Sequence, residues 1–300
     1  MGDEKIINPD STFPNKKEVV YDYKKTTKLI KETQTIIKEA KTGQTEATWI
    51  PNLDFPNKPF GILLMSDIHY GSIGVDYDLL DRHLELVENT PNMFLATNGD
   101  HIDNFNAVKH ATGMMENPIP PFLQGRAFFQ RLLELDKKGK IASIAQGNHD
   151  DFGQLGGQDF YDTFVREFSA PIFSQGGILT IDTPGYKYKL VHNHTYWGRS
   201  KINITNAPKR LLEYEGNGEG DIGWVGHTHQ SSYEHFNKGG KDLLAVVSGA
   251  YKQNDPWAAK NGISGHSGEP GIVLVLWPDK RKMECIKDIE VAAGVITFSK

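Results

Sequence analysis

The hydrophobic positions of this 300-residue chain fall into short runs, and each run leads directly into a cluster of polar residues. The runs lie at 60–66, 93–98, 140–146, 187–191 and 221–225. Short, mainly apolar segments bounded by turn residues are typical of strands that are buried on both faces. The pattern therefore predicts a chain that returns repeatedly to one core and presents polar side chains where each strand ends.

Helical periodicity separates the earlier runs. Apolar residues recur every three or four positions at 76–89, 122–139 and 158–169, and a further helix is expected around 203–215. This alternation is typical of α/β proteins. After residue 170 the strands follow one another with little helix, and the runs at 243–249, 271–277 and 283–289 suggest a second, more antiparallel sheet. We expect two sheets packed face to face with helices outside.

Residues 1–56 differ from the rest because they are polar and rich in lysine. Tyr23, Ile30 and Ile37 recur at seven-residue spacing, which predicts a helix over 18–41 with a narrow apolar stripe. Three prolines between 51 and 59 indicate a connector. The expected organisation is a basic, mostly helical extension over 1–56 and one domain over 57–300. Packing across that domain, self-association and binding of a polyanionic partner all remain open for the helix.

Composition and charge limit the cellular compartment and the kinds of partner expected for the chain. The formal net charge of −5 predicts no global attraction to nucleic acid or to an anionic membrane. The single cysteine, Cys285, excludes a disulfide within the chain and fits a reducing compartment. The N-terminal residues lack the features of a secretory signal, and the longest apolar run, 271–277, is too short to span a bilayer. We therefore expect a cytoplasmic protein without a membrane anchor.

The polar clusters that follow the strands consist of residues that can bind metal ions. They are Asp67, His69, Asp100, Asp103, Asn148, His149, Asp150, His192, His194, His227 and His229. Ligand sites of open α/β sheets form beyond the carboxyl ends of the strands. Carboxylate, amide and imidazole ligands suit Mn²⁺, Fe, Zn²⁺ or Mg²⁺. There are more candidates than one ion needs, which favours a pair of ions bridged by a carboxylate.

Five motifs in this order resemble those of the calcineurin-like metallophosphoesterases: DIH (67–69), GDHID (99–103), GNHD (147–150), VHNH (191–194) and GHTH (226–229). The resemblance covers about residues 60–280. It implies an α/β fold, a four-layer sandwich of two mixed β-sheets flanked by α-helices, to which the N-terminal helical extension is added. It also implies two divalent metal ions, with Mn²⁺ favoured over Fe, Zn²⁺ or Mg²⁺.

The resemblance assigns metal ligands residue by residue. One ion would be bound by Asp67, His69 and His229, the other by Asn148, His192 and His227, and both by Asp100. The VHNH motif offers two histidines. His192 is favoured because it follows the strand directly, which leaves His194 to line the substrate side.

The resemblance also implies the chemistry. A hydroxide between the two ions would attack the phosphorus atom of a phosphoester. His149 would act as the general acid for the leaving group, and Asp103 would hold His149 in orientation. Tyr70 and Tyr196 follow the first and fourth motifs, where a ring can stack on a nucleobase. His101 lies at a tolerant position of its motif and is expected to face solvent.

The substrate class is less closely specified. Asn104 follows GDHID at a position where the protein Ser/Thr phosphatases have arginine, so that activity is not favoured. A phosphodiester of a nucleotide or nucleic acid is preferred over a phosphomonoester. One alternative is a DNA-processing nuclease component whose basic N-terminal helix contacts DNA. Another is a catalytically silent metal-binding scaffold, although no expected ligand is missing.

Overall fold

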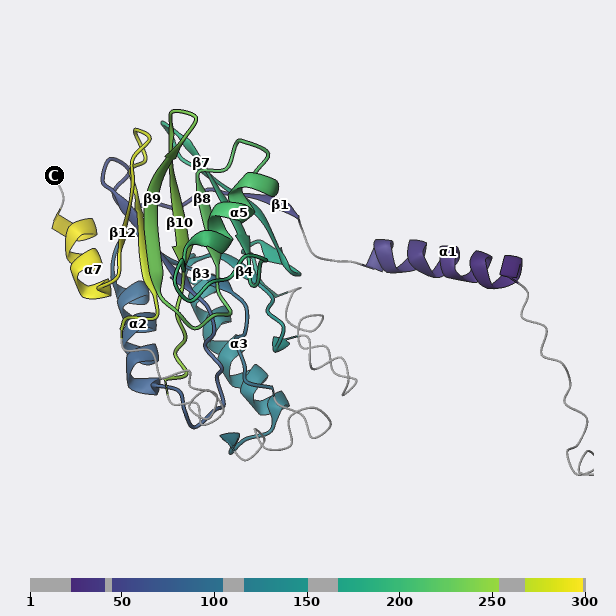
Figure 1. Cartoon of the computed structure of the whole chain (residues 1–300). Coiled ribbons are helices and arrows are strands. Elements are labelled where there is room, and N and C mark those ends of the chain that lie inside the picture. Colours follow the sequence, from purple (N-terminus) through teal and green to yellow (C-terminus); the bar gives the residue numbers. More distant parts are fainter. Residues whose placement is uncertain (1–22, 41–44, 105–115, 151–166, 254–267, 299–300) are drawn as a thin grey trace, which may run out of the picture. The chain divides into compact units, whose positions relative to one another are not determined.

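The computed structural model describes residues 23–40, 45–104, 116–150, 167–253 and 268–298 (Figure 1). The chain divides into two units, Met1–Thr42 and Gly43–Lys300. Helix α1, Tyr23–Ala40, belongs to the first unit. It lies within the helix predicted over 18–41. Self-association through α1 stays a prediction.

One sheet, here called sheet B, contains the strands that precede the first three motifs. Its strands are β2 (Phe60–Met65), β3 (Met93–Asn98), β4 (Ile141–Ala145), β5 (Ile172–Phe173), β11 (Ile272–Leu276) and β12 (Met283–Ile286). Their order is β12-β11-β2-β3-β4-β5. Strands β2 to β5 run parallel, whereas β11 and β12 pair antiparallel. Parallel neighbours place the ends of β2, β3 and β4 at the same edge of the sheet.

The other sheet, here called sheet A, contains the strands that precede the last two motifs. Its strands are β1 (Glu46–Trp49), β6 (Gly176–Asp182), β7 (Lys187–Asn193), β8 (Ile222–Val225), β9 (Ser232–Lys238) and β10 (Lys241–Val247). Their order is β1-β6-β7-β8-β10-β9. Strand β8 is parallel to both β7 and β10, while β6 and β9 pair antiparallel with β7 and β10. Both sheets are therefore mixed.

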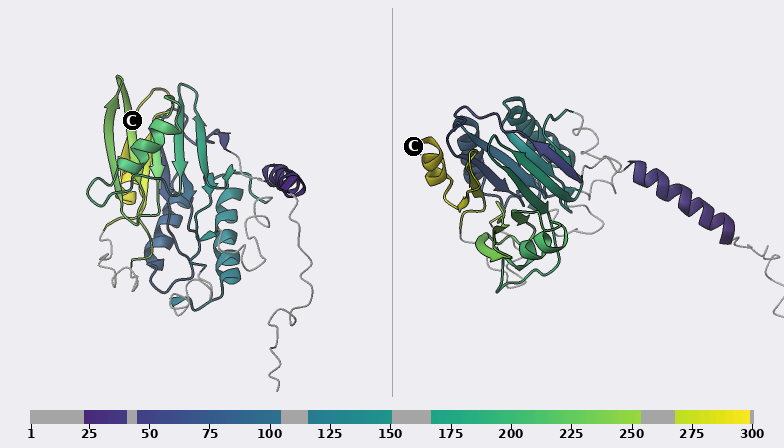
Figure 2. Two further views of the ribbon diagram at one scale, coloured as in Figure 1. Left: turned by 45° about the vertical axis from the view of Figure 1, so that its right-hand side comes forward. Right: turned by 90° about the horizontal axis from the view of Figure 1, so that it is seen from above.

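Helices cover the outer faces of the two sheets (Figure 2). They are α2 (Tyr77–Asn89), α3 (Pro121–Lys137), α5 (Asn206–Tyr214) and α7 (Ile289–Phe298). Helices α2, α3 and α7 contact sheet B, and α5 contacts sheet A. The predicted four-layer α/β sandwich is confirmed. Across the described ranges, no helix combines the length and the hydropathy that a membrane span requires.

Burial on two faces explains the continuous apolar runs. In β2, Leu63 and Met65 face the core beneath the helices of sheet B, whereas Ile62 and Leu64 face the core between the sheets. Successive side chains of a strand point to opposite faces, so a strand between two cores must be apolar throughout. The same arrangement fixes where each run ends, because polar residues are tolerated only at the edge of both cores.

The structure corrects two expectations about the strands. Strands β11 and β12 pair with β2 in sheet B and do not belong to a separate antiparallel sheet. Strand β1 falls within the predicted extension 1–56, yet it pairs with β6 as an edge strand of sheet A. The part that folds with the sheets therefore begins earlier than predicted. The helix predicted over 158–169 lies mostly outside the described residues.

Candidate metal centre

The five motifs meet where strands of the two sheets end. The amide of Asp67, after β2, donates to the carbonyl of Gly99, after β3, at 3.1 Å. The amide of His227, after β8, donates to Asp67 Oδ2 at 2.8 Å, which joins sheet A to sheet B. The amide of Gly226 donates to the carbonyl of His194 at 3.0 Å. Residues separated by up to 160 positions thus share one set of hydrogen bonds.

The backbone at this junction is strained. Several motif residues adopt left-handed φ values, namely Asp67 (52°), His69 (52°), Asp100 (51°), His227 (67°) and His229 (56°). This conformation costs about 1–2 kcal/mol for each residue that carries a Cβ. Such strain persists only where the surroundings hold it, and it concentrates at functional sites. The turns aim the side chains of the motif residues at one place.

Glycines allow the motif loops to approach one another. Gly99 has φ +86°, and a Cβ on it would lie 2.5 Å from the Cα of Gly147. A Cβ on Gly226 would lie 2.7 Å from Asp67 Oδ2. Neither position can accept a larger residue without moving backbone or a buried carboxylate. The glycines of the second, third and fifth motifs are therefore part of the site's construction.

One cluster is formed by Asp67, His69 and His229, each of which offers one ligand-type atom within 4.8 Å of the other two. His229 Nε2 is 3.2 Å from His69 Nε2 and 3.4 Å from Asp67 Oδ1. Burial raises the pKa of the Asp67 carboxyl, but the charge of His194 and the hydrogen bond from His229 lower it more. The net pKa therefore falls below its ordinary value.

A second cluster is formed by Asp100, His194 and His227, again within 4.8 Å. Asp100 also groups with His69 and His149, so it lies between the two sets. His194 Nε2 is 3.1 Å from Asp100 Oδ2. Burial alone would lower the pKa of His194, but the negative charges of Asp100 and Asp67 raise it to about 10. The site attracts positive charge strongly.

The comparisons with known proteins concern the fold. No family model and no curated protein matches the chain. Vacuolar Protein Sorting 29 from Cryptosporidium parvum is 15% identical, with 76% of this chain and 96% of that chain covered and a TM-score of 0.38. A metallophosphoesterase from Sphaerobacter thermophilus is 18% identical, with 75% of this chain and 87% of that chain covered and a TM-score of 0.36. Nuclease MPE from Pseudomonas putida is 11% identical, with 75% of this chain and 87% of that chain covered and a TM-score of 0.32.

Two mixed sheets, helices on both outer faces and five motifs that converge between the strand ends form one arrangement. This arrangement is consistent with the fold that the resemblance to the calcineurin-like metallophosphoesterases implies. Within this fold, the described residues bring together the aspartates and histidines of the first, second and fifth motifs as the sequence predicts. The third and fourth motifs differ from the prediction in detail.

The second cluster contains His194, whereas the sequence favoured His192 as the ligand from the fourth motif. Strand β7 continues to Asn193, so His192 lies inside the strand and His194 is the first residue beyond it. His192 is buried, with its ring 4.6 Å from that of Phe173 and perpendicular to it. Neither of its ring nitrogens has a hydrogen-bond partner among the described residues. Both histidines point to the same face of the sheet, but only His194 reaches the cluster.

Asp103 holds His149 through its backbone, not through the predicted side chain. His149 Nδ1 donates to the main-chain carbonyl of Asp103 at 2.6 Å, and the His149 amide donates to Asp100 Oδ1 at 2.8 Å. The Asp103 carboxylate instead lies 3.0 Å from His69 Nδ1. Lys252 Nζ is 3.3 Å from the same carboxylate oxygen. Buried Lys252 was not predicted, and no motif indicates it.

A hydrogen-bonded chain behind Asp67 was also missed. Trp224 Nε1 donates to Ser248 Oγ at 2.9 Å, Ser248 Oγ is 2.8 Å from Ser66 Oγ, and Ser66 Oγ is 2.5 Å from Asp67 Oδ2. An indole N–H only donates and a carboxylate only accepts, so every proton in the chain points toward Asp67. Ser66 precedes a motif residue directly, but nothing in the sequence indicates Ser248.

His101 does not face solvent as expected. It is buried, with Nδ1 at 2.9 Å from Asp150 Oδ2 and Nε2 at 2.7 Å from Thr97 Oγ1. Asp150 Oδ2 also accepts a hydrogen bond from the amide of Gly147 at 2.8 Å. The carboxylate of the third motif therefore fastens that loop to the second motif.

The two tyrosines predicted near substrate have different surroundings. The ring of Tyr70 stacks on Phe128 with centroids 5.4 Å apart, and it packs against the core beneath the helices of sheet B. Tyr196 is half-buried, and its hydroxyl donates to Glu215 at 2.9 Å. Its ring centroid is 6.0 Å from that of exposed Trp197.

The donor atoms fit divalent metal ions. His194 Nδ1 donates to the carbonyl of Asn98 at 2.7 Å, and His69 Nδ1 faces the Asp103 carboxylate, so both rings keep Nε2 for the cluster. Histidines that bind metals are usually anchored in this way. Asn148 Oδ1 is buried and accepts no hydrogen bond from the described part of the chain. An orphaned amide oxygen is explained if it is a ligand.

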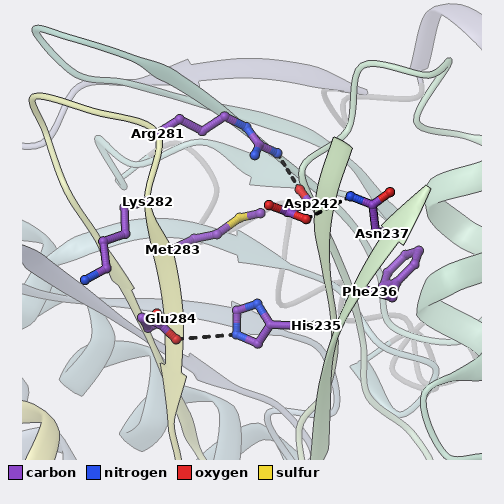
Figure 3. Close-up of a pocket in the computed structure, with 8 residues that line it drawn as sticks. All are labelled: His235, Phe236, Asn237, Asp242, Arg281, Lys282, Met283 and Glu284. Atoms are coloured by element: carbon purple, nitrogen blue, oxygen red, sulfur yellow. Dashed lines mark hydrogen bonds and ion pairs between the residues drawn. The ribbon is translucent and has the colours of Figure 1, made fainter. Parts of the chain in front are cut away.

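A cavity of about 480 Å³ lies elsewhere, between β9, β10 and β12 (Figure 3). Three of its charged or titratable residues, Arg281, His235 and Glu284, are in ion pairs within the protein. Arg281 Nη2 donates to Asp221 Oδ1 at 3.0 Å, and His235 Nε2 is 3.5 Å from Glu284 Oε2. The clustered aspartates and histidines of the metal centre take no part in this cavity.

Proposed function

We propose that the chain is a dinuclear metal-dependent phosphoesterase that hydrolyses a phosphodiester of a nucleotide or nucleic acid. The observation that carries this proposal is the position of Asp100 between two clusters of ligand-type atoms. Asp67 and Asp100 are both buried, and burying a carboxylate costs free energy unless its charge is offset. Two cations at this place would offset the charge of Asp67 and Asp100 and would give the orphaned Asn148 oxygen a partner.

The proposed ligands follow the two clusters. Asp67, His69 and His229 would hold one ion, Asn148, His194 and His227 would hold the other, and Asp100 would serve both. His194 takes the place that the sequence favoured for His192. Mn²⁺ is the favoured metal, with Fe, Zn²⁺ and Mg²⁺ as alternatives that the same oxygen and nitrogen donors accept. A cytoplasmic location, suggested by the single cysteine, belongs to the same proposal.

When bound, the ions would lower the pKa of water and offset negative charge on the phosphoryl oxygens. His149 supplies the proton for the leaving oxygen. Because its Nδ1–H is used by the Asp103 carbonyl, Nε2 is the atom that carries the transferable proton. Asp103 fixes His69 through its carboxylate and His149 through its carbonyl, so one residue orients a ligand and the acid together.

Substrate preference is tested by comparing bis(p-nitrophenyl) phosphate with p-nitrophenyl phosphate in the presence of Mn²⁺. The proposal expects the diester to give the higher kcat/KM. A higher value for the monoester would replace the diester preference with the phosphomonoesterase alternative. If Mn²⁺ binds but neither compound nor a panel of nucleotides is hydrolysed, the silent scaffold becomes the better account.

The nuclease alternative has its own measurement. A DNA-processing role for the lysine-rich N-terminal residues predicts DNA binding that weakens steeply with salt and is lost when residues 1–50 are deleted. DNA affinity that is independent of the deletion would remove that role.

Replacing each histidine of the fourth motif in turn should give opposite results. His192→Leu is expected to leave Mn²⁺ stoichiometry unchanged and to maintain or raise the free energy of unfolding, because burying an unpaired polar group costs about 1–3 kcal/mol. His194→Leu is expected to lose one of two ions. Metal analysis and chemical denaturation of both variants make the comparison. Loss of metal in His192→Leu with full binding in His194→Leu would reinstate the original assignment.

Removing the hydroxyl behind Asp67 should weaken metal binding. Ser66→Ala leaves Asp67 Oδ2 without its shortest hydrogen bond, so the carboxylate is less firmly oriented, and the affinity for Mn²⁺ should fall by about 10- to 100-fold. The matched control is Ser143→Ala, because Ser143 is equally buried but has no hydrogen-bond partner among the described residues. Equal metal affinities in the two variants would exclude this orienting role.

A further inference from the structure

Aromatic side chains gather on the surface formed by helix α5 and the loop that follows His194. Trp197 is 50% exposed and Tyr214 is 55% exposed, and their ring centroids are 5.1 Å apart. Ile202, on the same loop as Trp197, is 99% exposed. An exposed apolar patch of this kind usually marks a binding site. These residues serve neither the core nor the metal ligands.

The patch is held in place by helix α5. The guanidinium carbon of Arg210, on α5, lies 4.3 Å from the Trp197 ring centroid and covers part of the indole. Gly198 has φ +90°, and a Cβ there would lie 2.5 Å from Arg210 Cδ. Asn206 Nδ2 donates to the carbonyl of Gly198 at 2.7 Å. The loop therefore folds back on the helix and presents Trp197 from a fixed support.

The same loop starts at the metal centre. His194 belongs to a ligand cluster, and Trp197 follows it by three positions. Arg199 is exposed, and no carboxylate among the described residues pairs with it. Three residues span at most about 11 Å, so Trp197 lies within that distance of His194, and Arg199 follows two positions later on the same loop. A ring on Trp197 and a phosphate at the metals could thus belong to one molecule.

We propose that Trp197, backed by Arg210 and Tyr214, forms a subsite that stacks the nucleobase of the phosphodiester substrate, with Arg199 facing the phosphate backbone. This inference rests on the proposed function and specifies its substrate class. A flat, exposed indole accepts any base, because stacking depends on the π-face and not on hydrogen-bond pattern. The cations suit a phosphate ester better than a neutral partner, although the whole chain carries a net charge of −5.

The test compares two chromogenic diesters that differ only in the base-bearing part. They are thymidine 5′-(p-nitrophenyl phosphate) and methyl p-nitrophenyl phosphate, both assayed with Mn²⁺. Trp197→Ala should raise KM for the thymidine ester on the order of 10-fold more than KM for the methyl ester, and Trp197→Phe should restore part of the difference. The control is Trp277→Ala, because Trp277 also has a cation, Lys282 Nζ, 4.1 Å from its ring centroid.

Direct binding separates this inference from the proposed function. Titration calorimetry with thymidine 5′-phosphate and with methyl phosphate needs no turnover, so it remains informative if the chain hydrolyses neither diester. The subsite predicts tighter binding of the thymidine compound by wild-type protein and loss of that advantage in Trp197→Ala. Equal affinities for both compounds in wild-type protein, or an unchanged advantage in Trp197→Ala, would overturn it.

Discussion

Replacing His149 with alanine is expected to lower kcat by about 100- to 10 000-fold while the metal content stays at the wild-type level. His149 belongs to neither of the two clusters that are proposed to hold the ions. Its Nδ1 is fixed by the carbonyl of Asp103, so only Nε2 is left to contact the substrate. The loss is therefore one of proton donation. Steady-state kinetics together with metal analysis of the same preparation measures both quantities.

The leaving group gives a sharper readout for His149. A p-nitrophenolate leaves readily without a proton, whereas an alkoxide needs one, so His149→Ala should impair an alkyl diester much more than an aryl diester. The control is His235→Ala, because His235 lies in the separate cavity beside Glu284. An equal loss for both leaving groups would contradict the acid role, and a loss of metal would make His149 a ligand.

Asp100→Asn is expected to abolish measurable hydrolysis and to reduce Mn²⁺ binding from two ions to one or none. Asp100 groups with His194 and His227 in one set of ligand-type atoms and with His69 and His149 in another, and His69 in turn belongs to the cluster of Asp67 and His229. Asparagine keeps the shape but removes the charge, so the electrostatic attraction for a second cation is lost. Equilibrium dialysis against Mn²⁺ gives the stoichiometry.

The control for Asp100 is Asp182→Asn. Asp182 is the last residue of β6, outside the five motifs, and its carboxylate pairs with Lys187 at 2.7 Å. That variant should bind two ions. Retention of both ions by Asp100→Asn would show that Asp100 does not bridge, and the proposed centre would have to be two independent sites or none.

Burial on both faces determines which strands can be predicted. Strand β3, Met93–Asn98, coincides with its predicted run because both faces of the strand are buried. Strand β9, Ser232–Lys238, is a polar edge strand with no fully buried residue, so no apolar run marks it. Strand β5 has only two residues. Strands β11 and β2 pair although they lie more than 200 residues apart, and no local sequence pattern indicates which strand is the partner of β11.

The candidate site could be predicted in outline because each motif directly follows a strand. The choice between His192 and His194 could not, since both point to the same face and the strand's last residue decides which one reaches the cluster. The sequence also cannot tell a contact through the Asp103 carbonyl from one through its carboxylate. Ser248 and Lys252 join the site from outside the motifs, through tertiary packing alone.

The most direct measurement of the central claim is a crystal structure of the protein with Mn²⁺, with anomalous differences recorded at the manganese edge. Our account predicts two peaks about 3.5–4 Å apart, one beside Asp67, His69 and His229 and the other beside Asn148, His194 and His227, with Asp100 between them. A single peak, or peaks that avoid Asp100, would contradict it.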